Sequence, residues 1–126
     1  MTVPHPLPTL YGLKQCDSCR RARRLLDELG VTYRFVDVRA DATDQQGHLD
    51  NTLLTQWMNA VPWETLVNRR STTWRQLDAA DREGLDADKA RTLLRQHPTL
   101  LKRPLLMTEH DVTVGIDEAR YAALVL

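Results

Sequence analysis

The chain has 126 residues, of which 42% are hydrophobic and 27% charged, and its 17 basic and 17 acidic side chains cancel. This length and composition are typical of a soluble globular protein, so we expect residues 1–126 to form one domain. Zero net charge disfavours binding to nucleic acid or to an anionic membrane surface. No apolar run approaches the roughly 18 residues of a membrane span, and no secretion signal is recognisable, so we expect a cytoplasmic location.

The first third of the chain predicts a strand, a helix and a second strand. Residues 9–12 are β-like, and Gly12 is expected to permit an unusual turn. Residues 20–29 follow the helical period, and Gly30 is a suitable residue to end that helix. Residues 31–38 are rich in β-branched and aromatic side chains, which indicates a strand. Two strands joined so closely through a helix should be parallel.

The middle of the chain predicts a helical insert. Residues 49–60 follow the helical period, and residues 73–76 fit a capping box that opens another helix. Asp86 is placed to cap the N-terminus of a helix over residues 87–96. We expect the tryptophans of the chain, which all lie in this insert, to pack in its core: Trp57, Trp63 and Trp74.

The last part of the chain predicts a β-hairpin followed by a helix. Residues 104–107 and 112–114 are β-like, and the polar connector between them indicates an antiparallel pair. Asp117 is placed to cap the last helix, and Ile116 with Tyr121 has the spacing of a hydrophobic staple. The expected order is therefore β-α-β, a helical insert, and β-β-α.

The two cysteines, Cys16 and Cys19, form a C-x-x-C pair at the junction between the first strand and the first helix. A helix N-terminus carries partial positive charge and unpaired N–H groups, which stabilise a thiolate. We expect Cys16, at the very start of the helix, to be the nucleophile, with Lys14 and Arg20 adding positive potential. Cys19 lies a turn deeper, on the apolar face, where it can act as the resolving thiol.

Two other interpretations of the cysteine pair stay open. A structural zinc site needs four protein ligands, and the chain has no second C-x-x-C pair. The histidines are scattered at no ligand spacing: His5, His48, His97 and His110. Alternatively, both cysteines are small hydrophobic residues without chemistry. The redox spacing favours chemistry over both, so we expect neither a metal site nor a bound cofactor.

Three separated segments resemble the ArsC (arsenate reductase) family, and most closely its YffB branch: residues 11–17, 66–77 and 101–106. The resemblance extends over nearly the whole chain after Pro8. It implies an α/β, thioredoxin-like fold with a mixed four-stranded sheet, in which a helical insert separates the β-α-β half from the β-β-α half. The family also contains the Spx regulators, which carry C-x-x-C followed by arginine, as residues 16–20 do here.

The resemblance also implies roles for single residues. The nucleophile of the family maps to Cys16, and its anion-binding strand start maps to Arg103 and Pro104. The bond between Arg103 and Pro104 corresponds to the family's cis-proline bond, which turns the backbone toward the catalytic sulfur.

The oxyanion site of the family's arsenate reductases is incomplete in this sequence. Those enzymes hold the oxyanion with three arginines, of which only Arg103 is clearly kept. The first falls at Asn68, although Arg70 is close by, and the last falls at Gly115. Guanidinium forks bind oxyanions through charge-assisted bonds, so arsenate is not the expected substrate.

The sequence therefore predicts a thiol–disulfide or glutathione-dependent reductase. Cys16 attacks an oxidised sulfur, and Cys19 or glutathione resolves the mixed disulfide. Glutathione is the expected co-substrate, and glutathione or a protein thiol or disulfide is the expected partner. The predicted substrate-binding residues are Lys14, Arg20, Arg70, Arg103 and Pro104. The alternatives are an Spx-like redox-sensing regulator that binds RNA polymerase, and an arsenate reductase with a degenerate oxyanion site.

Overall fold

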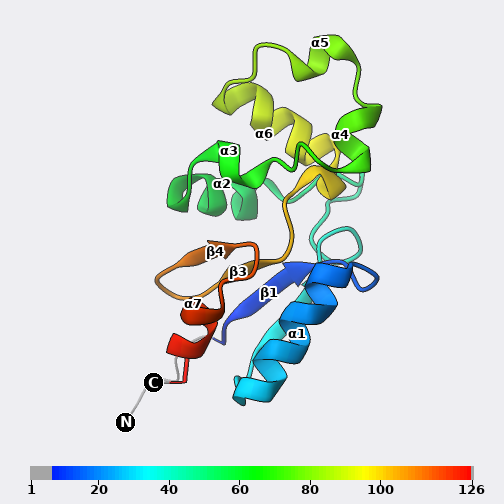
Figure 1. Cartoon of the computed structure of the whole chain (residues 1–126). Helices are drawn as coiled ribbons and strands as arrows, with labels where there is room; N and C mark the ends of the chain where they lie inside the picture. Colours follow the sequence, from blue (N-terminus) through cyan, green and yellow to red (C-terminus); the bar gives the residue numbers. More distant parts are fainter. Residues whose placement is uncertain (1–6, 126) are drawn as a thin grey trace. The chain divides into compact units, whose positions relative to one another are not determined.

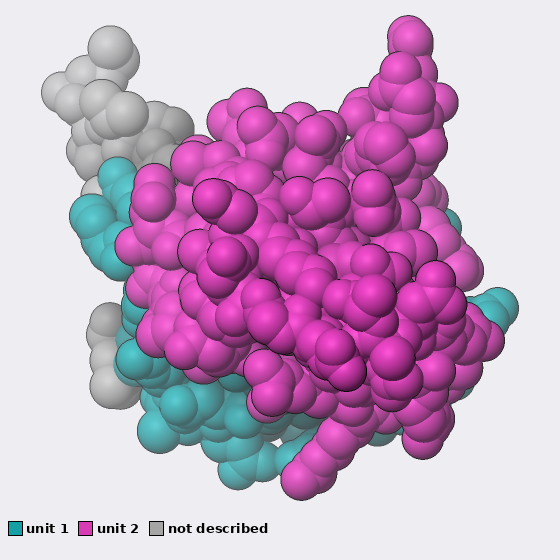
Figure 2. Space-filling view, turned by 90° about the horizontal axis from the view of Figure 1, so that it is seen from above, with its two compact units in different colours: residues 1–37, 103–126 teal, residues 38–102 magenta. Residues whose placement is uncertain are grey.

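The computed structural model describes residues 7–125 (Figure 1), so His5 lies outside the described residues. The chain divides into two compact units, which Figure 2 colours teal (residues 1–37 and 103–126) and magenta (residues 38–102). The second unit coincides with the helical insert expected between the two halves. The expectation of one domain over the whole chain stays a prediction. No helix within residues 7–125 has the length and apolar character needed to cross a membrane.

The first unit contains a mixed four-stranded sheet, as the sequence predicts. Its strands are β1 (Thr9–Gly12), β2 (Arg34–Asp37), β3 (Leu105–Met107) and β4 (Val112–Val114), in the order β2-β1-β3-β4. The β1 and β2 strands pair in parallel, whereas β3 pairs antiparallel with both β1 and β4. The β-α-β half and the β-hairpin therefore meet at β1 and β3, which confirms the expected thioredoxin-like sheet.

Helix α1 (Asp17–Leu29) connects the two parallel strands. It buries Cys19, Ala22 and Leu26, which the helical period of three and four residues places on one face. Gly30 ends the helix in the left-handed conformation, at φ 75°. The Val31 N–H still donates to the Leu26 carbonyl at 3.0 Å. This helix cap occupies the residues after Gly30, so β2 is shorter than the predicted strand over residues 31–38.

The core of the first unit lies between the sheet and two helices. Leu10 of β1 and Leu106 of β3 are opposite each other in the sheet and pack against Ala22 and Leu26 of α1. Tyr121 of α7 (Glu118–Ala123) completes the cluster. Burying a leucine or phenylalanine side chain stabilises a fold by about 1.5–3 kcal/mol. This shared apolar cluster therefore holds both helices on one face of the sheet.

The second unit is helical, and two of its helices begin at predicted or recognisable caps. Asp50 accepts from the Leu53 N–H at 2.8 Å, and Asp86 accepts from the Lys89 N–H at 2.8 Å, which confirms the predicted cap at Asp86. The described helices of this unit are α2 (Asn51–Ala60), α3 (Trp63–Leu66), α4 (Thr72–Gln76), α5 (Ala79–Arg82), α6 (Ala87–Gln96) and the short 3-10 helix η1 (Pro98–Leu100).

The predicted capping box over residues 73–76 is wrong. Helix α4 is capped by Ser71, whose Oγ accepts from the Trp74 N–H at 3.0 Å and donates to the Asn68 carbonyl at 2.7 Å. The serine is anchored by the preceding turn, so the cap lies two residues before Thr73, the N-cap of the predicted capping box, and the helix ends at Gln76. Helix α5 was not predicted.

The prediction that the three tryptophans pack in the core is confirmed for only one of them. Trp57 is 0% exposed, whereas Trp63 and Trp74 are half-buried. The guanidinium of Arg69 lies over the Trp74 ring at 5.5 Å from its centre. A cation over an aromatic face is a stabilising contact that leaves the ring partly exposed.

Candidate active site

Cys16 occupies the N-cap position of α1, as the sequence predicts. Its carbonyl accepts the first helical hydrogen bond from the Arg20 N–H at 2.9 Å, and its own N–H donates to the Leu13 carbonyl at 3.2 Å. The turn from Leu13 to Cys16 thus leads directly into the helix. As the N-cap residue, Cys16 lies at the positive end of α1. Its side chain is only half-buried, so it keeps access to solvent.

The surroundings of Cys16 stabilise its thiolate. Burial is the largest single influence and raises the pKa of Cys16, but hydrogen bonds from the Cys19 side chain and backbone, together with the hydrogen bond and the positive charge of Arg103, outweigh it. The net result is a pKa below the ordinary thiol value. A depressed pKa with partial exposure is the condition under which a cysteine acts as a nucleophile.

Cys19 has the opposite character. It is 0% exposed, and burial together with the hydrogen bond to Cys16 raises its pKa to about 12. The Leu13 N–H and the charge of Arg103 act against this shift. Both cysteines are free thiols in the structure. Cys16 is therefore the more acidic thiol, while Cys19 holds its proton at neutral pH.

Arg103 and Pro104 begin the chain segment that leads into β3. The peptide bond between them is cis, which confirms the expectation from the family resemblance. The Pro104 carbonyl accepts from the Gly115 N–H at 2.8 Å, which joins this segment to the end of β4. Arg103, 87 residues after Cys16 in the sequence, is the cation that acts on both cysteines.

Lys14 and Arg20 are not among the groups that the structure gives as the main causes of the lowered pKa of Cys16, and their substrate-binding role stays a prediction. Both side chains are exposed, and the Arg20 Nε donates to the Lys14 carbonyl at 3.2 Å. The main groups that lower the pKa of Cys16 are Cys19 and Arg103 instead. Water and salt screen exposed charges, so these two side chains affect the pKa of Cys16 less than their closeness in sequence suggests. Arg103 has the larger effect because the fold brings its guanidinium close to the sulfur.

Gly12 is needed for space rather than for a turn. Its φ is not among the positive values found in this chain, which contradicts the unusual turn expected at this position. A Cβ atom placed on Gly12 would lie 2.5 Å from the Cys19 Sγ, closer than real Cβ contacts allow. Any side chain here would push the buried sulfur away. The feature of the sequence that could have indicated this close contact is a glycine at the end of the strand, directly before the active-site turn.

Asp37 is a site residue that the sequence analysis missed. It is buried at the end of β2, in register with Gly12, and its Oδ2 accepts from the Lys14 N–H at 3.3 Å. This contact fixes the turn that carries Cys16. The available signal was a carboxylate at the carboxyl end of the strand that pairs with β1.

The predicted site residues fall in different units. The first unit contains Cys16, Cys19, Lys14, Arg20, Arg103 and Pro104. Arg70 lies in the second unit, where its N–H donates to the Asn68 side-chain oxygen at 3.0 Å and its side chain is exposed. Its substrate-binding role stays a prediction. Among residues 7–125, no three His, Cys, Asp or Glu side chains are grouped so that they could hold a metal ion.

The two thiols should separate clearly in a titration with iodoacetamide. Alkylation requires the thiolate, so each rate rises with pH through the pKa of its cysteine. We expect the midpoint for Cys16 to fall below the ordinary value of about 8.5, and Cys19 to stay protonated until pH approaches about 12. Peptide mapping by mass spectrometry at each pH measures both. Faster labelling of Cys19 at neutral pH would reverse the assignment of roles.

The sheet, the helix-capping cysteine and the cis-proline segment define a thioredoxin-like protein with a dithiol site. The family model of the ArsC family matches residues 11–124, and the chain belongs to this family. An uncharacterised protein of Haemophilus influenzae is 36% identical over 91% of this chain and 96% of that protein. The solved structure of a YffB protein is 37% identical, with a TM-score of 0.83, and covers 94% of this chain and 99% of that one.

A regulator is also among the relatives. The global transcriptional regulator Spx of Listeria innocua is 28% identical over 87% of this chain and 80% of that protein. Family membership and these relatives together support a thiol-based reductase or an Spx-like regulator.

Proposed function

We propose that this chain is a thiol–disulfide oxidoreductase that uses Cys16 as its nucleophile and glutathione as its co-substrate. The observation that carries the proposal is the asymmetry of the two thiols. Cys16 is half-exposed with a lowered pKa, and Cys19 is buried with a pKa of about 12. An exposed thiolate beside a protonated, buried partner is suited to attack first and to be resolved afterwards.

The proposed reaction has two exchanges. The Cys16 thiolate attacks one sulfur of a disulfide, which forms a mixed disulfide and releases the other sulfur as a thiolate that takes a proton from water. The Cys19 thiolate, or glutathione, then attacks the Cys16 sulfur and releases the second product. The substrate gains two electrons, and two molecules of glutathione are oxidised to restore the dithiol.

Arg103 is proposed to bind a carboxylate of glutathione or of a peptide substrate. Its guanidinium acts on the Cys16 thiolate, so an anionic group held there would lie near the reacting sulfur. The proposal also places the chain in the cytoplasm, where a reducing environment keeps a catalytic dithiol available for turnover.

Trapping the mixed disulfide tests this function. A Cys19→Ser variant treated with oxidised glutathione should gain one glutathionyl group on Cys16, because the resolving thiol is absent. Intact-mass and peptide mass spectrometry locate the adduct, and a Cys16→Ser variant serves as the matched control. A stable adduct only in the Cys19→Ser protein supports the proposal. Absence of any adduct on Cys16 would contradict it.

A second candidate function is redox sensing of the Spx kind. The observation that favours it is the similarity to the Listeria innocua regulator, together with an arginine directly after the C-x-x-C pair. In that case the disulfide is a switch, and the output is contact with RNA polymerase without turnover. Steady-state turnover with glutathione favours the enzyme, whereas redox-dependent co-purification with polymerase favours the regulator.

A further inference from the structure

Gly12, the buried last residue of β1, lies against the sulfur of Cys19. A Cβ atom on Gly12 would lie 2.5 Å from the Cys19 Sγ, 3.1 Å from the Cys19 Cβ and 3.6 Å from the Phe35 Cε2. The contact with Phe35 is an ordinary one. The sulfur and the added carbon would have to separate from 2.5 Å to 3.4 Å, by about 0.9 Å, to reach ordinary contact. The buried sulfur therefore fills the space that a side chain at Gly12 would need.

The strand that carries Gly12 is held on both sides. β1 is an inner strand of the sheet, between β2 and β3. Gly12 is in register with Asp37 of β2, and Tyr11 is in register with Leu105 of β3. Asp37 also accepts from the Lys14 N–H at 3.3 Å, in the turn that leads to the reactive thiol. A retreat of Gly12 from the sulfur would therefore disturb two strand pairings and this turn.

Helix α1, which carries Cys19, is held by apolar packing. Ala22 and Leu26 lie on the same buried face as Cys19. Both pack in the core cluster of the first unit, which includes Tyr121 of α7. Moving α1 away from the sheet would expose this cluster, and burial of each large apolar side chain contributes about 1.5–3 kcal/mol.

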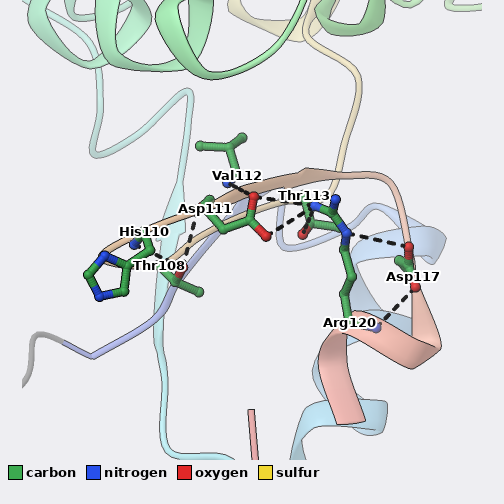
Figure 3. Close-up of polar contacts among 7 residues, drawn as sticks. All are labelled: Thr108, His110, Asp111, Val112, Thr113, Asp117 and Arg120. Carbon is green, nitrogen blue, oxygen red and sulfur yellow. Dashed lines mark hydrogen bonds and ion pairs between the residues drawn. The ribbon is translucent and has the colours of Figure 1, made fainter. Parts of the chain in front are cut away.

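Helix α7 is itself tied to the sheet by a polar clamp of Arg120, Asp111, Thr113 and Asp117 (Figure 3). The Arg120 Nη1 donates to the Asp111 Oδ2 at 3.2 Å and to the Thr113 Oγ1 at 3.3 Å, which joins the helix to the β3–β4 hairpin. Asp117 caps the helix by accepting from the Arg120 N–H at 3.1 Å. The sheet and both helices thus form one connected frame around Gly12 and the buried thiol.

Within this frame, the Cys19 sulfur is the part that a side chain at Gly12 would displace. The helix backbone fixes the Cys19 Cβ, so the sulfur can move only by rotation about χ1. In its present position the Cys19 side chain forms a hydrogen bond with Cys16, which favours the Cys16 thiolate. Rotation away from Gly12 would break this contact. The absence of a side chain at Gly12 therefore lets the buried thiol face the reactive one.

We propose that Gly12 is a positioning residue of the dithiol, whose bare Cα seats the Cys19 sulfur against Cys16. This inference rests on the proposed function, because the seated sulfur is the one that resolves the mixed disulfide. In that step Cys19 gives its proton to water, its thiolate bonds to the Cys16 sulfur, and the bond from Cys16 to the substrate sulfur breaks. The leaving thiolate takes a proton from water, so no further reactant is needed.

A double-mutant cycle on the whole chain tests whether Gly12 acts through the sulfur. The test variant is Gly12→Ala, which adds one methyl group. The same change is made together with Cys19→Ala, where the sulfur that the methyl group would meet is gone, and Cys19→Ala alone completes the cycle. Asp111→Ala is the matched control, because it loosens the first unit at the clamp rather than at the cysteines.

Three measurements are made on each protein. The rate of alkylation of Cys16 by iodoacetamide over a range of pH gives the midpoint of its ionisation. Unfolding in urea gives the stability. Stopped-flow absorbance with the aromatic disulfide dithiobis(nitrobenzoate) separates the two exchanges: attack by Cys16 releases a first coloured nitrothiobenzoate, and attack by Cys19 on the mixed disulfide releases a second.

We expect Gly12→Ala to raise the alkylation midpoint of Cys16 by about 1–2 pH units, the effect of losing one hydrogen bond to a charged group. Above that midpoint the first phase should be unchanged and the second about 100-fold slower, as for a misplacement of about 1 Å. Cys19→Ala and the double variant should share one midpoint, and Gly12→Ala should destabilise the fold much less when the sulfur is absent. Asp111→Ala should change neither thiol measurement.

A midpoint and a second phase like those of the wild type in Gly12→Ala would overturn the inference. Equal effects of Gly12→Ala with and without the Cys19 sulfur would also overturn it. If Gly12→Ala does not fold, a folded double variant supports the inference and an unfolded one overturns it. Absence of the second phase in the wild type would overturn the resolving role of Cys19 and this inference with it. Absence of the first phase would overturn the proposed function, whereas the alkylation cycle would still show whether Gly12 seats the sulfur.

Discussion

Replacing Cys16 with serine is expected to reduce disulfide turnover to the uncatalysed rate. The hydroxyl of serine is not ionised near neutral pH, so the contributions of Cys19 and Arg103 that stabilise a thiolate have no group to act on. The measurement is the rate of reduction of a low-molecular-weight disulfide with glutathione supplied, followed through the oxidised glutathione formed. The fold should be retained, because the Cys16 side chain makes no capping hydrogen bond to α1.

The matched comparison for this result is Cys19→Ser. This variant keeps the nucleophile, so its first exchange should persist while turnover depends on glutathione to resolve the mixed disulfide. Turnover that survives Cys16→Ser and disappears in Cys19→Ser would show that the buried thiol is the nucleophile. That outcome would contradict the assignment of roles from burial and pKa.

Arsenate reduction is expected to be negligible. The resemblance to arsenate reductases places arginines at positions that are Asn68 and Gly115 here. Each lost charge-assisted contact to an oxyanion costs about 1.5–3 kcal/mol. Two such losses amount to roughly a 150- to 20,000-fold deficit if they add. The assay is arsenite production with glutathione and glutaredoxin, compared with the Cys16→Ser variant.

The local structure explains why these two positions do not serve as arginine sites. Gly115 has φ 79°, a conformation that side-chain-bearing residues rarely adopt. Asn68 accepts from the Arg70 N–H at 3.0 Å through its side-chain oxygen, which shapes the turn before α4. Strong arsenite production that depends on Cys16 would contradict the prediction, and would show that Arg69, Arg70 or Arg75 supplies the missing charge.

The features that the sequence predicted well are those set by neighbouring residues. The caps at Asp86 and Asp117, the end of α1 at Gly30 and the buried face of α1 each depend on side chains within one or two turns. The position of Cys16 at the start of α1 follows the same logic. Local hydrogen bonds and helical periodicity are sufficient for these predictions, and the structure confirms them.

The errors have a common physical origin. Thr73 and Ser71 are both residues of a type that can cap α4. Ser71 is the cap in the structure, and it also contacts Asn68 across the preceding turn. Likewise, Lys14 and Arg20 are near Cys16 in sequence but exposed, whereas Arg103 approaches through the fold. Spacing along the chain says which groups are available, but not which of them the backbone brings into contact.

For this protein, the order of the strands and the placement of the cysteine pair at the start of α1 could be read from the amino-acid pattern. The pattern did not reveal that Gly12 makes room for the Cys19 sulfur, or that Asp37 holds the active-site turn. These two relations join β1 to α1 and β2 to the turn before α1, and no local period describes them. Helix caps and apolar faces arise from interactions within a few residues, whereas the pKa values of the two thiols depend on burial and on charges that only the packed sheet and helices bring together.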